Sequence, residues 1–430
     1  MFNLKVSTDR LYNLSAFCKL EFDNDVTLPV GVVMIEEEKE FLEEEDQRET
    51  EEDLANLDQS LFPQAVVSGN DWTTETLINQ INKGNILLDP AFQRRDAWDK
   101  KRKSLFVESL ILGLPVPQLV LAESKDRRGA YIVLDGKQRM LTIRQFAASS
   151  TDPQFEQLKL TGLEIRKDLI GKTLQSLRED LTLFDDLSAF ENQPIRTVVI
   201  KNWPNEDFLY HVFLRLNTGS VSLSPQELRQ ALHPGPFVKF LNLESSESNA
   251  LREILKLKKP DFRMRDAELL LRYYAFRNFI GEYTGNLKAF LDSTCGKLNE
   301  SWEKENQNLL VQTREFETAH QFAKKIFGEN VYRKWNGEKY ERRFNRAIFD
   351  IFILSFIRQD IREAAHGKEQ EIEIAFKNLC TNSKEFLSSI ESTTKSTWAT
   401  QTRISLWNET LNALLETNLP GLRLVDNGNR

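Results

Sequence analysis

Five consecutive residues, Asp135-Gly136-Lys137-Gln138-Arg139, combine a turn glycine with two cations that could bind phosphate. They follow an apolar run that predicts a strand, and they open a helical pattern. A helix start offers free backbone N–H groups and the positive end of the helix dipole, and Lys137 and Arg139 would add charge there. Gly136 would permit a tight backbone approach. The string therefore predicts a small phosphate site, and an Asp-Gly turn with exposed cations is the alternative.

A run of four cations, Lys100-Lys101-Arg102-Lys103, lies on the first turns of a predicted helix that Asp99 would cap. Such a run can follow the phosphates of a nucleic acid, and we expect these four residues to bind one. A solvated helix face is the alternative. Trp98 precedes the run and would offer a stacking surface.

Other candidate motifs give weaker evidence of a functional site. Gly171-Lys172-Thr173 lacks the glycine that a P-loop has five positions earlier, where Arg166 stands, so we expect Thr173 to lie near a helix start. The three cysteines lie far apart, which excludes a disulfide scaffold and a cysteine-based zinc cluster. The four histidines have no HxxxH or HNH-like grouping, so we predict no metal site built on histidine and no nuclease activity by the chain alone.

The net charge of −8 is unevenly distributed. Residues 36–53 hold 12 acidic and 2 basic residues, a net −10, so the rest of the chain sums to +2. The acidic segment is either a solvated linker or a mimic of nucleic acid that covers a basic site. No run of 18 apolar residues exists, so we expect no membrane span, and the cysteine usage fits a cytoplasmic protein.

The patterns along the chain predict an α+β protein. Apolar runs at 118–124, 130–136 and 195–200 predict strands between helical patterns, and a short strand is expected at 86–88. A small mixed α/β module is therefore expected first. From residue 237 onward the apolar residues repeat at a period near 3.6, which predicts a mainly helical C-terminal region.

The expected organisation has three parts. Residues 1–69 would be an N-terminal extension, 70–235 the α/β module and 236–430 the helical region. Near the end of the module, Ser224, Pro225 and Glu227 form a strong helix-start signal: a capping residue, a proline in the first turn and a glutamate three residues after the cap.

Four motifs occur in order across roughly residues 72–235. They are Phe92-Gln93-Arg94 with Trp98, the Asp135–Arg139 string, Asn217-Thr218-Gly219, and Glu227-Leu228-Arg229. The set resembles the N-terminal domain family of GmrSD-type restriction endonucleases, which looks similar in fold to the ParB and sulfiredoxin superfamily. The family signature DGQQR reads DGKQR here, with Lys137 in place of glutamine. A weaker echo of the family occurs at residues 263–276.

The resemblance implies that the module binds a nucleoside triphosphate. Asp135 and Arg139 would be the catalytic pair of a slow hydrolysis, with Asp135 orienting Arg139 or coordinating Mg²⁺. The nucleotide-binding residues that the resemblance implies are Gln93, Arg94, Asp135, Gly136, Lys137, Gln138, Arg139 and Asn217.

The resemblance also implies a role. We expect a component of a bacterial anti-phage or restriction-type defence system that couples nucleotide to DNA recognition. Its partners would be DNA, a separate nuclease or toxin, and a second copy of the chain in a homo-oligomer. The alternatives are a non-enzymatic, ParB-like DNA-binding regulator and a scaffold that docks a separate nuclease or toxin.

Overall fold

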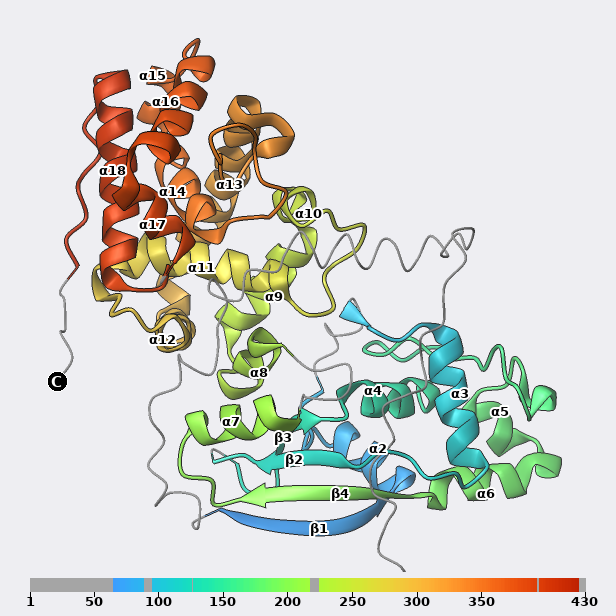
Figure 1. Cartoon of the computed structure of the whole chain (residues 1–430). Coiled ribbons are helices and arrows are strands. Elements are labelled where there is room, and N and C mark those ends of the chain that lie inside the picture. Colours follow the sequence, from blue (N-terminus) through green and yellow to red (C-terminus); the bar gives the residue numbers. More distant parts are fainter. Residues whose placement is uncertain (1–64, 89–94, 126, 217–223, 393, 425–430) are drawn as a thin grey trace, which may run out of the picture. The chain divides into compact units, whose positions relative to one another are not determined.

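A four-stranded sheet and a large set of helices make up the described part of the chain, which confirms the predicted α+β class (Figure 1). The structure, a computed structural model, describes residues 65–88, 95–125, 127–216, 224–392 and 394–424.

Several predicted features lie outside the described residues. Among them are the acidic segment 36–53 and the predicted nucleotide-binding residues Gln93, Arg94 and Asn217. The chain divides into two units between Glu43 and Glu44, and all the geometry below concerns the second unit.

The sheet is mixed and has the order β1-β4-β2-β3. The outer pairs β1–β4 and β2–β3 are antiparallel, and the central pair β2–β4 is parallel. Three of the four strands confirm the predicted ones, whereas Ile86 contributes only a single bridge to Tyr131. The strands are β1 (Val66–Thr73), β2 (Leu119–Glu123), β3 (Tyr131–Asp135) and β4 (Pro194–Lys201).

The first strand was not predicted. β1 is an edge strand whose residues are mostly exposed or half-buried, so its sequence lacks the alternation that marks a strand. The expected boundary between residues 69 and 70 falls inside β1.

The two faces of the sheet bear separate hydrophobic cores. Side chains alternate along β2, so Leu119 and Leu121 belong to one core and Val120 and Ala122 to the other. The first core also takes in residues of the helices α2 (Thr74–Asn82), α3 (Lys100–Ile111), α4 (Lys137–Phe146), α5 (Leu174–Glu179) and α6 (Phe184–Asn192). The second takes in residues of α7 (Glu206–Leu216) and α8 (Pro225–Leu232).

Local signals in the sequence set three helix starts as predicted. The Asp99 side chain accepts a hydrogen bond from the backbone N–H of Arg102 and caps α3. Thr173 caps α5, which confirms that it belongs to a helix start. Ser224 and Glu227 form the predicted capping box at the start of α8.

The described residues after α8 are mainly helical, as the period near 3.6 predicts. α11 is buried from Asp266 to Phe276 and contacts α8, α9, α10, α12 and α14, so it is the central helix of this region (Figure 1). The helices are α9 (Pro236–Glu247), α10 (Asn249–Ile254), α11 (Arg265–Phe279), α12 (Leu287–Glu300), α13 (Trp302–Phe327), α14 (Arg346–Phe356), α15 (Gln359–Ala364), α16 (Glu369–Asn382), α17 (Lys384–Glu391) and α18 (Thr397–Leu415). Short 3-10 helices occur at Lys167–Leu169, Leu181–Leu183, Ile280–Glu282 and Gly328–Asn330.

Candidate functional site

The junction between β3 and α4 carries the DGKQR string. β3 ends at Asp135, Gly136 turns the chain with a φ of 97°, and α4 begins at Lys137. A Cβ at Gly136 would collide with the Leu119 side chain and would lie 3.2 Å from an Arg139 nitrogen. Only glycine therefore fits this position, for its backbone angle and for the neighbouring side chains alike.

Asp135 and Arg139 form an ion pair across the first turn of α4. The Nη2–Oδ2 distance is 3.0 Å, and the same Nη2 donates to the backbone oxygen of Gln118 at 2.9 Å. Asp135 therefore orients Arg139. The Arg139 Nε and the neighbouring Gln138 Oε1 are buried, and neither has a hydrogen-bond partner in the described part of the chain.

The start of α4 has no side-chain cap. Gly136 occupies the N-cap position and has no side chain to accept a hydrogen bond from the first turn. The first amides of a helix lack intrahelical acceptors and lie at the positive end of its dipole. An anion is the natural partner of such a helix end.

Lys137 is placed in the interior rather than on an exposed phosphate-binding surface. Its side chain is only 8% exposed, and its Nζ lies 2.5 Å from Oε1 of Glu227, whose side chain is 6% exposed. The other carboxylate oxygen of Glu227 accepts the backbone N–H of Ser224 at 2.8 Å and completes the capping box of α8. The structure thus brings two of the four sequence motifs into direct contact.

The polar residues of α8 tie three other helices together. Glu227 contacts α4 through Lys137, and the Arg229 Nε lies 2.6 Å from Oδ1 of Asp292 on α12. Gln230 exchanges hydrogen bonds with Asn242 on α9 through their side-chain amides. α8 therefore links the DGKQR junction to the helical region.

Asp292 on α12 extends the connection from α8 to α7 through Lys288. Its Oδ2 lies 2.8 Å from the Lys288 Nζ, and Lys288 also reaches Asp207 of α7 at 2.9 Å. Burial alone would raise the pKa of Asp292, but the charges of Arg229 and Lys288 outweigh burial and lower that pKa.

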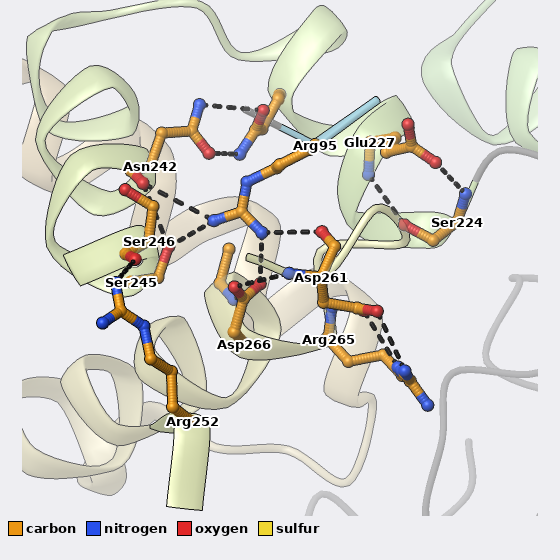
Figure 2. A network of polar contacts seen from close by, with 12 residues as sticks. Arg95, Ser224, Glu227, Asn242, Ser245, Ser246, Arg252, Asp261, Arg265 and Asp266 are labelled. Carbon is orange, nitrogen blue, oxygen red and sulfur yellow. Dashed lines mark hydrogen bonds and ion pairs between the residues drawn. The ribbon is translucent and has the colours of Figure 1, made fainter. Parts of the chain in front are cut away.

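Arg95, which directly follows the FQR motif, anchors the module to the start of α11. It forms a buried ion pair with Asp266, and the same Nη1 donates to the backbone oxygen of Asp261 at 2.8 Å. Its Nη2 donates to the hydroxyl of Ser245 at 2.8 Å (Figure 2). Sequence reasoning missed this pair, although Asp266 lies within the weaker family echo at 263–276.

The four cations predicted to bind nucleic acid differ in exposure on α3: one is buried and three are exposed. Lys103 is buried, contacts Asp96, and donates to the Gln145 carboxamide at 2.6 Å. The other three residues of the run are exposed. Lys100 pairs with Glu156 at 3.0 Å, and the Arg102 guanidinium lies 4.7 Å from the centre of the Trp98 ring.

Comparison with known proteins bears on the module. Residues 74–234 match the family model of the GmrSD restriction endonuclease N-terminal domain. The family predicted from the four motifs is thereby confirmed for this segment. The matched segment begins with α2 and ends just after α8, so β1 lies outside it although β1 pairs with β4.

The helical region from α9 onward also lies outside the GmrSD N-terminal match. No curated protein and no solved structure matches the chain. The likeness of fold to ParB and sulfiredoxin therefore stays a prediction. None of the described helices has the length and apolar character that a membrane span needs.

Proposed function

We propose that this chain is a nucleotide-binding component of a restriction-type defence system and that it couples nucleotide to DNA recognition. One observation carries the proposal. The start of α4, which no side chain of its N-cap residue caps, lies beside polar atoms of Gln138 and Arg139 that are buried and have no hydrogen-bond partner among the described residues, within a match to the GmrSD N-terminal domain. Buried polar atoms normally have a partner, and a bound ligand would supply one here.

The nucleotide would place its phosphates at this helix start. The backbone amides around Gly136 and the Arg139 guanidinium would hold phosphate oxygens, because a helix N-terminus and a forked cation both favour such anions. Gln138 would add a polar contact. Gln93, Arg94 and Asn217, which the family resemblance implicates, would complete the site.

Lys137 would act by positioning rather than by contact with phosphate. Its charge is compensated by Glu227, which also caps α8. The lysine that replaces the family glutamine would thus join the start of α4 to the start of α8. A change in α4 on nucleotide binding would reach α8 directly.

Asp135 is the carboxylate of the site and would hold Mg²⁺ together with the phosphates. Mg²⁺ commonly takes one or two carboxylates plus phosphate oxygens and keeps several waters, so a single aspartate fits this need. The ion would neutralise charge on the transferring phosphoryl group. Asp135 and Arg139 would orient and stabilise that group, which is the main requirement of phosphoryl transfer.

DNA would contact the exposed part of the basic run on α3. Lys100, Lys101 and Arg102 face solvent, whereas Lys103 is internal. Cations on one helix turn follow a phosphate backbone without reading its sequence. Trp98, under the Arg102 guanidinium, would then serve to hold that arginine.

Nucleotide binding by the purified chain tests the site. Calorimetry with ATP, GTP, CTP and UTP should find a nucleotide that Arg139→Ala binds roughly 10- to 150-fold more weakly, the equivalent of a charge-assisted contact. Arg128 is an exposed arginine on the β2–β3 turn, and Arg128→Ala should bind as the wild type does. Equal affinity in the wild type and Arg139→Ala would refute this site.

A second candidate function is a nucleotide-regulated DNA-binding protein that does not hydrolyse its nucleotide. The departure from DGQQR favours it, because the family glutamine is replaced by Lys137, which is paired with Glu227, and Asp135 is already paired with Arg139. Phosphate release decides between the two. Turnover that Asp135→Asn abolishes supports the enzyme, and binding without turnover supports the regulator.

A further inference from the structure

A cavity of about 770 Å³ lies between the end of α2, the last turn of α4 and the segment that joins α8 to α9. These elements are labelled in Figure 1. The volume falls within the range of sites that bind small molecules. None of the sequence motifs pointed to this cavity.

One part of the cavity wall is apolar. Ile81, Ile86, Leu88, Phe155 and Val238 line it, and each is buried in the fold. Side chains of this kind bind the flat, apolar body of a ligand rather than an ion alone.

The charged residues of the cavity all have one sign. Lys83, Arg144 and Lys239 line it, and no acidic residue does so among the described lining residues. Neither Lys83 nor Lys239 forms an ion pair within the described ranges, and both are exposed. The cavity therefore offers positive charge that the described neighbours leave uncompensated at two of three positions.

Arg144 is the most buried of the three cations. Its Nη2 lies 2.5 Å from Oδ2 of Asp152, and its guanidinium lies 4.4 Å from the centre of the Phe155 ring. Its Nε is buried and has no hydrogen-bond partner in the part of the chain that the structure describes. Asp152 and Phe155 thus fix the guanidinium in place, while its Nε–H has no partner among the described residues.

We propose that this cavity binds a nucleoside phosphate. The base would lie against the wall that contains Phe155, and the phosphate would be held by Lys83, Arg144 and Lys239. The Asn82 carboxamide, which also lines the cavity, would offer a donor and an acceptor to the edge of the base. The ligand is either a free nucleotide or one nucleotide of a DNA single strand.

This site is separate from the start of α4. Arg144 lies seven residues after Lys137, about 10 Å along the helix axis, in the last turn of α4. The inference does not rest on the proposed function, since none of the cavity residues belongs to the DGKQR string. Gln230 and Ala231 of α8 also line the cavity, so its ligand would contact the helix that holds Lys137 through Glu227.

The test reverses two exposed charges of the cavity. Lys83→Glu/Lys239→Glu is made in the Arg139→Ala background, which removes the phosphate contact proposed for the start of α4. Binding of ATP, of dCMP and of a short single-stranded oligodeoxynucleotide is then measured by fluorescence anisotropy or calorimetry. Lys259→Glu/Lys304→Glu in the same Arg139→Ala background is the matched control, because it changes the net charge equally at two exposed lysines that do not line the cavity. Unfolding curves establish that both variants fold.

We expect the cavity variant to bind at least about tenfold more weakly than the control, a loss of ~1.4 kcal/mol. Loss of mononucleotide binding identifies a free nucleotide as the ligand, and loss confined to the oligodeoxynucleotide identifies a nucleotide of a strand. Equal binding by both double variants to all three probes overturns the proposal. Arg139→Ala tests the α4 site independently, so failure of one site does not imply failure of the other.

Discussion

Lys137 and Glu227 join the start of α4 to the start of α8 by a buried ion pair with an Nζ–Oε1 distance of 2.5 Å. The two residues are 90 positions apart in the chain and belong to different sequence motifs. Because Glu227 also closes the capping box of its own helix, one carboxylate fixes the position of both helix starts. Removal of either partner takes the counter-ion of this pair away from a buried charge.

A double-mutant cycle measures this coupling. Lys137→Met and Glu227→Gln should each lower the free energy of unfolding by about 3–5 kcal/mol, the usual cost of an uncompensated buried charge. The loss of unfolding free energy in the double variant should be clearly smaller than the sum of the two single losses, because the double variant removes both charges of the pair. Urea unfolding provides the values.

The exposed pair Lys100–Glu156 serves as a control for that cycle. Its two residues are largely solvent-exposed, so Lys100→Met should change stability by no more than about 1 kcal/mol. Additive costs for Lys137→Met and Glu227→Gln would contradict the coupling that the structure shows.

Gly136→Ala should destabilise the fold by two separate effects. Its φ of 97° costs a side chain about 1–2 kcal/mol, and the clash with Leu119 adds about 1–3 kcal/mol of overpacking. Gly337 is a matched control, because its φ is 98° and no atom lies within 4 Å of a Cβ placed there. Gly337→Ala should therefore show the backbone cost alone, and equal losses in the two variants would remove the packing argument.

Arg95→Ala should lower the free energy of unfolding by about 3 kcal/mol or more, because it removes the counter-ion of the buried Asp266 carboxylate. Arg95→Lys should recover only part of this loss, since an ammonium cannot reproduce the fork that also reaches Asp261 and Ser245. Thermal and urea unfolding report both changes. A full rescue by lysine would show that charge alone matters at this position.

Acid should weaken the connection between α8 and α12. The pKa of Asp292 is lowered in the folded state, so its contribution is fully present above the unfolded value of about 4 and is lost as the pH falls through the folded pKa. The free energy of unfolding between about pH 5 and pH 2 should therefore fall less steeply in Asp292→Asn than in the wild type. Identical slopes would mean that Asp292 does not bear on acid stability.

Local signals in the sequence were sufficient for much of the fold. The caps at Asp99, Thr173 and Ser224 depend on residues three positions apart, and all three occur as predicted. The apolar period near 3.6 after residue 237 likewise predicted the helical region. β1 was missed because an exposed edge strand carries no apolar alternation, and because its partner β4 lies more than 120 residues later.

The candidate site was predictable only in part. The Asp135–Arg139 pair lies one helix turn apart, which the sequence displays directly. The ion-pair partners of Lys137 and Lys103 depend on where α8 and the segment around Asp96 pack. No local sequence pattern predicts this packing. For the same reason the pair Arg95–Asp266, 171 residues apart, could not be predicted from the sequence.

The most direct test of the central claim is the affinity for DNA measured with and without nucleotide. If the two sites are coupled as proposed, a nucleotide that binds at Arg139 changes the DNA affinity of the wild type. Because coupling is reciprocal, DNA then changes the nucleotide affinity by the same factor. We predict such a change of about 5-fold or more with one of ATP, GTP, CTP or UTP, and its loss in Arg139→Ala. A DNA affinity that none of the four nucleotides alters would contradict the account.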